Sequence, residues 1–216
     1  LFVEDAIFSM DKDGKIKDNI GLTEIFYNSG LKSLIYNAGL QIDPYHLNSV
    51  VRIDQNFSNI LPKEGDYILS LRHMSMVAIY RPNLKKIIWY KIGPWTNQHS
   101  AQINQKGELY LFNNNVIDTI YSKGRDNHYF LSKEKNIINK FNFITNEVEI
   151  EENCNRPKDI YAITGGRVIL KKNILISIYR GITMFCNLDT KQQTFLFPDT
   201  DDGIVDTLAV RYLKSN

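Results

Sequence analysis

The sequence predicts an all-β fold, a partial β-propeller with about three four-stranded blades, preceded by an N-terminal hairpin and short helices. The composition disfavours helices, because 22 asparagines stand against only 6 alanines while isoleucine, tyrosine and phenylalanine are abundant. Short apolar runs separated by turn residues recur along the chain and predict strands. These runs fall into three groups of four, which begin at residues 46, 99 and 166. Repeats of four strands are typical of propeller blades.

Two elements precede the first blade. Apolar runs at 6–10 and 15–17 flank a turn that ends with Gly14, and this pattern predicts a hairpin. Residues 22–37 are predicted to form one or two short helices. Apolar side chains recur there at helical spacing: Leu22, Ile25 and Phe26.

The three groups of strands define the predicted blades. The strands are expected at 46–53, 66–72, 76–80 and 86–91, then at 99–103, 108–112, 136–143 and 147–150, and last at 166–170, 174–178, 182–187 and 194–197. A polar stretch at 114–134 is interpreted as a loop insertion. A β-sandwich is the competing architecture. We favour the propeller because the second strand of each group is almost continuously apolar, as burial between stacked blades requires.

These elements predict that residues 1–216 are the C-terminal part of a single, larger propeller domain. Its expected parts are the end of a preceding blade at 1–20, a helical connection at 21–45, blades at 46–91, 99–150 and 162–198, and a closing strand at 207–212. The chain begins with Leu1 rather than Met, and three blades cannot close a ring, so we expect a fragment. Because each blade covers its neighbour, the N-terminal side should expose an apolar sheet face and make the isolated chain prone to aggregation.

Charge and composition narrow the possible partners. The 26 basic and 24 acidic residues give a net charge of +2, which does not indicate a nucleic-acid groove. No apolar run approaches the roughly 20 residues of a membrane span, and no signal-peptide pattern opens the chain. The two cysteines, Cys154 and Cys186, allow one disulfide or two buried free thiols.

The candidate chemistry lies in histidines and one arginine. His46 and His99 open predicted first strands, while Arg72 ends a second strand and is followed at once by His73. First strands line the channel of a propeller, so we expect His46, Arg72 and His99 to converge on one pocket. There they can clamp an oxyanion, because arginine offers a planar fork and histidine serves as donor or nucleophile. The alternative is that each histidine merely bonds a backbone carbonyl at a strand end.

Other site types are less well supported. Two or three histidines can bind zinc, but no His-x-x-x-His or Cys-x-x-Cys spacing occurs, and an arginine among the ligands would repel a cation. We therefore expect no metal. No glycine-rich nucleotide loop and no Gly-x-Ser-x-Gly elbow is present either.

Three stretches resemble the arylsulfate sulfotransferase (arylsulfotransferase, ASST) family. They are DPYHLNSV at 43–50, GDYILSLRHMSMVAIYRP at 65–82 and KIIWYKIGPWTNQHSAQINQKGELYLFNNN at 86–115. The later GGRVILKKNILISIYRG and LAVRYL are similar to the last blade and closing strand of that family. The resemblance implies a six-bladed propeller with its active site in the central channel. It also implies transfer of a sulfuryl group from a phenolic ester to a phenol through a sulfohistidine, with no cofactor or nucleotide donor, and export to the periplasm.

The resemblance also implies roles for individual residues. The histidine of the Gln-His motif is the family's nucleophile and corresponds to His99, while His46 and Arg72 match the other catalytic positions. Asn48 and His73 lie beside them and are expected to contact the substrate. Where the family often reads Phe-Asp-Asn, this chain has Asn at 113 and 114.

Two aromatic residues next to these motifs are also candidates. Tyr45 and Trp95 can stack on an aryl ring, but ordinary packing within a blade is at least an equal alternative.

Two further functions stay open at this stage. The chain can be a propeller that binds or scaffolds without catalysis, or an aryl sulfate hydrolase in which water replaces the phenol. In the transferase interpretation the partners are an aryl sulfate donor and a phenolic acceptor. The sequence does not give the oligomeric state.

Overall fold

A computed structural model of the chain defines two compact units, residues 1–94 and 95–216, and we describe each by itself. The predicted closing strand at 207–212 lies outside the residues that the structure describes. The described residues are 2–38, 42–119, 129–133, 135–154, 162, 165–179 and 182–196.

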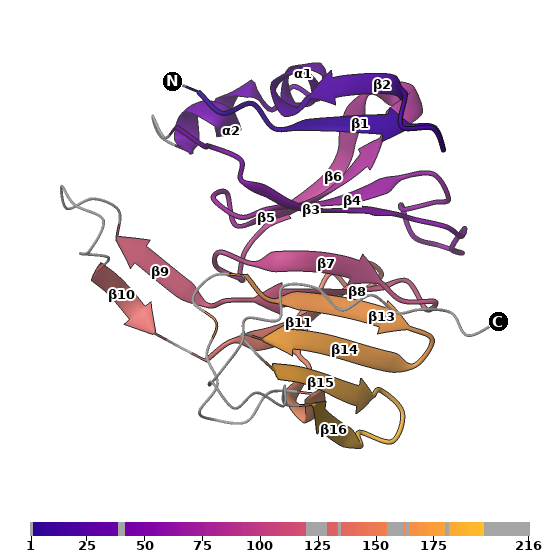
Figure 1. Cartoon of the computed structure of the whole chain (residues 1–216), viewed down its shortest axis with the longest axis vertical. Coiled ribbons are helices and arrows are strands. Elements are labelled where there is room, and N and C mark those ends of the chain that lie inside the picture. Colours follow the sequence, from indigo (N-terminus) through magenta and orange to yellow (C-terminus); the bar gives the residue numbers. More distant parts are fainter. Residues whose placement is uncertain are drawn as a thin grey trace. The chain divides into compact units, whose positions relative to one another are not determined.

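The first unit opens with the predicted hairpin and helices. Strands β1 (Ala6–Met10) and β2 (Ile16–Gly21) pair antiparallel, and α1 (Leu22–Asn28) and α2 (Lys32–Asn37) follow (Figure 1). Gly14 has φ 82 in the hairpin turn, a left-handed conformation that glycine adopts without strain. The hairpin leaves three large apolar side chains exposed: Phe8, Met10 and Ile16. No helix among the described residues is long and apolar enough to cross a membrane.

A distant carboxylate caps helix α1. Its N-cap residue is Gly21, which has no side chain to offer. Instead, Glu4 accepts hydrogen bonds from Thr23 N at 2.8 Å and from Thr23 Oγ1 at 2.5 Å. A negative charge at a helix N-terminus is favourable. A Cβ on Gly21 would lie 2.6 Å from Glu4 Oε1, so a side chain there would displace the cap.

Blade 1 completes the first unit. It consists of β3 (Leu47–Arg52), β4 (Tyr67–Leu71), β5 (Met76–Arg81) and β6 (Lys86–Ile92), antiparallel and in chain order, with a 3-10 turn η1 (Pro82–Leu84) between the last two. The middle strands β4 and β5 are almost wholly buried, which explains their continuous apolar runs.

The second unit contains two more blades. Blade 2 is β7 (His99–Ile103), β8 (Glu108–Asn113), β11 (Ile137–Asn142) and β12 (Val148–Ile150), and the 3-10 turn η2 (Glu152–Cys154) follows it. Blade 3 is β13 (Arg167–Lys171), β14 (Ile174–Tyr179), β15 (Ile182–Asn187) and β16 (Gln193–Leu196). The insertion after β8 contains two paired strands, β9 (Val116–Thr119) and β10 (Tyr129–Lys133), where we expected a plain loop.

The predicted fold class is confirmed. The described residues form three separate four-stranded antiparallel sheets, with the N-terminal hairpin and short helices beside the first. Within the second unit the inner strands of blades 2 and 3 are joined by hydrogen bonds. Ser100 Oγ donates to Val168 O at 3.0 Å, and Leu170 N donates to Gln102 Oε1 at 2.8 Å.

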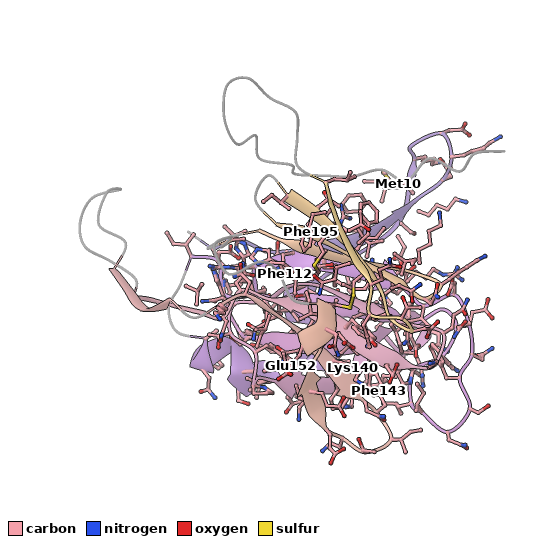
Figure 2. The ribbon with its side chains drawn as sticks, turned by 90° about the horizontal axis from the view of Figure 1, so that it is seen from below. Met10, Phe112, Lys140, Phe143, Glu152 and Phe195 are labelled. Atoms are coloured by element: carbon pink, nitrogen blue, oxygen red, sulfur yellow. A yellow bond between two sulfur atoms is a disulfide. The ribbon has the colours of Figure 1, made fainter. Side chains whose placement is uncertain are left out.

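A disulfide joins blades 2 and 3. Cys154 in η2 and Cys186 in β15 are bonded across 32 residues of chain, so the pairing that the sequence left open is present. Both cysteines belong to an apolar cluster with Phe112, and Phe195 packs against it. Figure 2 labels these two phenylalanines and draws the disulfide as a yellow bond.

Replacing both cysteines by serine is expected to lower the free energy of unfolding by about 3–4 kcal/mol. A crosslink over a loop of 32 residues lowers the conformational entropy of the unfolded chain, and this raises the free energy of the unfolded state by about that amount. Denaturant titration of the oxidised wild type and of the double variant measures the difference. Adding a reductant should destabilise the wild type and leave the double variant unchanged. A difference below about 1 kcal/mol would show that the bond does not constrain the unfolded chain.

Candidate active site

The first two strands of blade 1 bring two predicted motifs together. β3 and β4 run antiparallel, and Leu47 at the start of β3 pairs with Leu71 at the end of β4. His46 therefore precedes one strand where Arg72 and His73 follow the other. A backbone hydrogen bond from Arg72 N to His46 O, at 3.1 Å, continues the ladder beyond the strands.

Asp43 holds both imidazole rings of this blade. Its Oδ2 lies 2.6 Å from His46 Nδ1, and its Oδ1 accepts a hydrogen bond from His46 N at 2.9 Å. Its backbone carbonyl oxygen lies 2.5 Å from His73 Nδ1. The ring centroids are 4.5 Å apart. We call Asp43, His46, Arg72 and His73 the blade 1 cluster.

The contacts of Asp43 assign the tautomer of both rings. A carbonyl oxygen can only accept a hydrogen bond, so His73 Nδ1 carries a hydrogen, and an ionised carboxylate accepts from His46 Nδ1 in the same way. The neutral form of each ring then has its lone pair on Nε2. The His46 side chain is 40% exposed, so a ligand can reach it.

His73 is held in its neutral form. Burial lowers the pKa of its ring, and the neighbouring charges of His46 and Arg72 lower it further, against an opposing hydrogen bond to the Asp43 carbonyl. The unfolded chain therefore binds a proton at this residue more readily than the folded chain does. The folded state loses stability as the pH falls below the unfolded value of 6.5, down to the lower folded pKa.

Replacing His73 by asparagine is expected to flatten the fall in stability on the acid side of neutrality. Asparagine retains a donor for the Asp43 carbonyl but does not titrate. The measurement is the free energy of unfolding of both proteins at about pH 7.5 and about pH 5, which bracket the ordinary histidine pKa. The wild type should lose more stability than the variant, and equal losses would contradict the lowered pKa. His128→Asn, at a histidine to which we assign no role, is the control.

Arg72 and Asn48 lie at the same end of blade 1, where β3 begins and β4 ends. Arg72 is 7% exposed, and its charge contributes to the lowered pKa of His73. Asn48 lies in β3 where the register against β4 shifts between Leu47 and Ser49. A bulge of this kind turns a side chain out of the regular alternation of a strand.

The two aromatic candidates are buried. Tyr45 is 0% exposed and Trp95 is 1% exposed. The ring centroids of Tyr45 and Phe26 are 5.2 Å apart, and the Tyr45 hydroxyl oxygen is 2.8 Å from Thr23 Oγ1. These positions match the packing alternative for both residues, so neither enters the site that we propose below.

Three residues of the blade 1 cluster also have the spacing of metal ligands. Asp43, His46 and His73 each offer one ligand atom, and these atoms lie within 4.8 Å of one another. Spacing along the sequence did not reveal this group, because its members come from the ends of two strands. The adjacent Arg72 carries a permanent positive charge, which opposes a cation and attracts an anion.

In the second unit, a buried asparagine binds His99. His99 opens β7 opposite Phe112 of β8, and Asn114 follows directly after β8. The Nδ1 atom of His99 lies 2.7 Å from Asn114 Oδ1. Asn114 is 0% exposed, and its Nδ2 donates to Ala162 O at 2.9 Å and to Gly165 O at 2.8 Å.

A glycine allows this close contact between blades 2 and 3. Gly166 has φ 97, and a Cβ at this position would lie 2.3 Å from a ring carbon of Phe112. Only glycine fits there without displacing the ring. The absence of a side chain lets the segment before β13 lie against β8, and it brings the Gly165 carbonyl to Asn114.

The start of β7 has the same irregularity as the start of β3. Its register against β8 shifts between His99 and Ala101, and Ser100 between them has φ 54. His46 in blade 1 and His99 in blade 2, which we call the motif histidines, thus stand at or directly before a bulge in the first strand of the blade. Bulges are common next to active sites.

Sequence reasoning did not assign the partners of the two motif histidines. Asp43 is within the DPYHLNSV stretch and Asn114 within the FNNN stretch, but neither received a role. The Asp-x-x-His spacing is a local signal for the first partner. The second partner is 15 residues from His99 and is identified only by the pairing of β7 with β8.

Comparison with known proteins identifies a family for the chain. A family model described as arylsulfotransferase (ASST) matches residues 2–180, which include both histidines and their partners. No curated protein sequence matches the chain. Among solved structures, the chain is similar to one titled "Structure of U3-55K", at 10% identity and a TM-score of 0.36, over 71% of this chain and 52% of that one.

A second similar structure is a nidogen/laminin complex, at 9% identity and a TM-score of 0.28, over 62% of this chain and 59% of that one. The chain therefore spans a little over half the length of these two proteins. Neither likeness bears on the site, and the fold class stands on the three sheets described above. The family match covers more than half of the residues. The chain belongs to the arylsulfotransferase family.

Proposed function

We propose that the chain transfers a sulfuryl group from an aryl sulfate to a phenol, with His99 as the nucleophile. The family supports the reaction class. The hydrogen bond between His99 Nδ1 and Asn114 Oδ1 supports the role of His99 as nucleophile, which the resemblance of its Gln-His motif to that of the family implies. It leaves the lone pair of the neutral ring on Nε2, and a neutral imidazole nitrogen is a good nucleophile near neutral pH.

In the first step, His99 Nε2 attacks the sulfur of the donor. The nitrogen–sulfur bond forms while the bond between sulfur and the aryl oxygen breaks, and the phenolate leaves with a proton from a general acid. We propose His46 as this acid. Asp43 is bonded to its Nδ1, so Nε2 is the ring nitrogen that can exchange a proton with the substrate.

In the second step, the acceptor phenol attacks the sulfohistidine. The new sulfur–oxygen bond forms as the nitrogen–sulfur bond breaks, and the phenol proton returns to His46, which is now a base. The histidine nucleophile is regenerated, so the two proposed steps consume no nucleotide donor and use no cofactor.

Arg72 is proposed to stabilise the sulfuryl oxygens during both steps. Negative charge is spread over these oxygens while the attacking and leaving atoms lie in line. Catalysis then depends mainly on positioning and on fixed positive charge. A buried guanidinium supplies that charge in a planar fork of donors. Asn48 and His73, beside it in blade 1, are proposed to contact the substrate.

We further propose that the protein is exported, as its family implies. The disulfide between Cys154 and Cys186 is consistent with an oxidising compartment.

A chromogenic aryl sulfate, supplied with and without a phenol, tests the proposed function. Release of the chromogenic phenol that depends on the acceptor supports transfer. Equal release without the acceptor identifies a hydrolase instead, and no release supports a binding module. The rate should not change with a chelator, since the proposed chemistry uses no metal. A loss of activity on chelation that zinc restores would instead assign a cation to Asp43, His46 and His73.

A further inference from the structure

We infer that Asn114 is a positioning residue that fixes the reactive tautomer of His99. The inference rests on the proposed role of His99 as the nucleophile. It adds the reason why the correct ring nitrogen faces the substrate. A free imidazole exchanges its hydrogen between Nδ1 and Nε2, and only the form with the lone pair on Nε2 can attack from that atom.

The orientation of the Asn114 amide is determined by its surroundings. Its Nδ2 group has two hydrogens, and the two carbonyl oxygens of Ala162 and Gly165 accept them at 2.9 Å and 2.8 Å. If the amide were turned over, Oδ1 would face two other oxygens. Oδ1 must therefore face His99, where it can only accept. His99 Nδ1 is consequently the protonated nitrogen.

A second asparagine keeps the Ala162 carbonyl in place. Asn136 Nδ2 donates to Asn114 O at 2.8 Å and to Ala162 O at 2.9 Å, and its Oδ1 accepts from Ala162 N at 2.7 Å. Asn114 and Asn136 are 0% and 1% exposed. Water therefore does not compete for these hydrogen bonds, which are stronger for that reason.

The chemistry of Asn114 suits the proposed role of His99. A neutral amide directs the ring hydrogen to Nδ1 without adding charge beside the ring. Such a partner suits a nucleophile that must stay neutral.

Three variants of the full chain test the inference: Asn114→Ala, Asn114→Asp and Asn113→Ala. Asn113 is the matched control, since it is also buried but its Oδ1 accepts from Thr96 N and Asn115 N instead of a histidine. The first readout is nitrogen-15 NMR of the histidine rings, in which Nδ1–H and Nε2–H tautomers have different shifts. The His99 signal is assigned by its loss in His99→Gln. This readout needs no activity.

We expect the wild type and Asn113→Ala to show the Nδ1–H form of His99, and Asn114→Ala to show a mixture. The single-turnover rate of sulfation should fall about 10- to 100-fold in Asn114→Ala, as is typical when a group that orients a catalytic residue is lost. Asn114→Asp should also show a mixture of tautomers, because its second carboxylate oxygen would face the carbonyl oxygens of Ala162 and Gly165, which the amide hydrogens bond in the wild type.

Two results would overturn the inference: a wild-type His99 in the Nε2–H form, or an unchanged tautomer in Asn114→Ala. Failure of the proposed function looks different: either the wild type shows no acceptor-dependent turnover or His99→Gln turns over normally, while the NMR signals still follow Asn114.

Discussion

Replacing His99 by alanine is expected to reduce sulfuryl transfer by at least about 10⁴-fold. The nucleophile forms the covalent bond to sulfur, and removing a nucleophile that acts with its neighbours as a unit costs about that much or more. The substitution also removes the hydrogen bond between His99 and the buried Asn114 at the start of β7, so the folded state is checked beside turnover.

Steady-state turnover of an aryl sulfate with a saturating phenol measures this effect. His128→Ala is the control, as a change of a histidine to which we assign no role, and it should keep the wild-type rate. Thermal unfolding of both variants checks that they are folded. Near-normal turnover in His99→Ala would disprove the assignment of the nucleophile.

Replacing Arg72 by lysine is expected to lower turnover by roughly 10²–10³-fold and to leave measurable activity. Lysine keeps the positive charge but loses the planar fork that binds two oxygens at once. The loss of one donor that stabilises a transition state costs about this factor. Because the contact strengthens as charge develops, kcat should fall more than KM rises.

A second arginine of blade 1 provides the matched control. Arg81 forms two hydrogen bonds to Asp66, from Nε at 2.8 Å and from Nη2 at 2.7 Å, and it is assigned no part in the reaction. Arg81→Lys should cost about 1–2 kcal/mol of stability, through one lost charged hydrogen bond, with kcat unchanged in the folded protein. If Arg72→Lys behaves like Arg81→Lys, Arg72 is a structural residue.

The strands were predictable because their signals are local. β7 at His99–Ile103 and β15 at Ile182–Asn187 have the predicted bounds, and the other blade strands differ from the prediction by only a residue or two at their ends. In these segments the apolar pattern and the turn residues indicate the same element, so propensity and packing agree.

Features that depend on distant contacts were not predictable. The cap of α1 comes from Glu4, and the insertion after β8 pairs into two strands where we expected a loop. The bulges at Asn48 and Ser100 arise from pairing with a second strand, which a pattern along one strand does not reveal.

The candidate site likewise contains residues that local motifs predict and partners that depend on distant contacts. His46, Arg72 and His99 follow from motifs, and their placement at strand ends follows from the strand pattern. Their partners do not, because Asp43 bonds two histidines from separate strands and Asn114 depends on carbonyls of a later segment. Tyr45 was a candidate because it stands beside a motif, but its burial against Phe26 depends on a helix elsewhere in the chain.

The most direct test of the account is the mass of the peptide that carries His99 after reaction with donor alone. Without an acceptor phenol the second step cannot proceed, so the sulfohistidine should accumulate. Rapid quenching, digestion and mass spectrometry should then find one added sulfuryl group on the peptide with His99, and none in His99→Ala. A sulfuryl group on His46 or His73 instead, or acceptor-dependent turnover with no covalent adduct, would contradict the account.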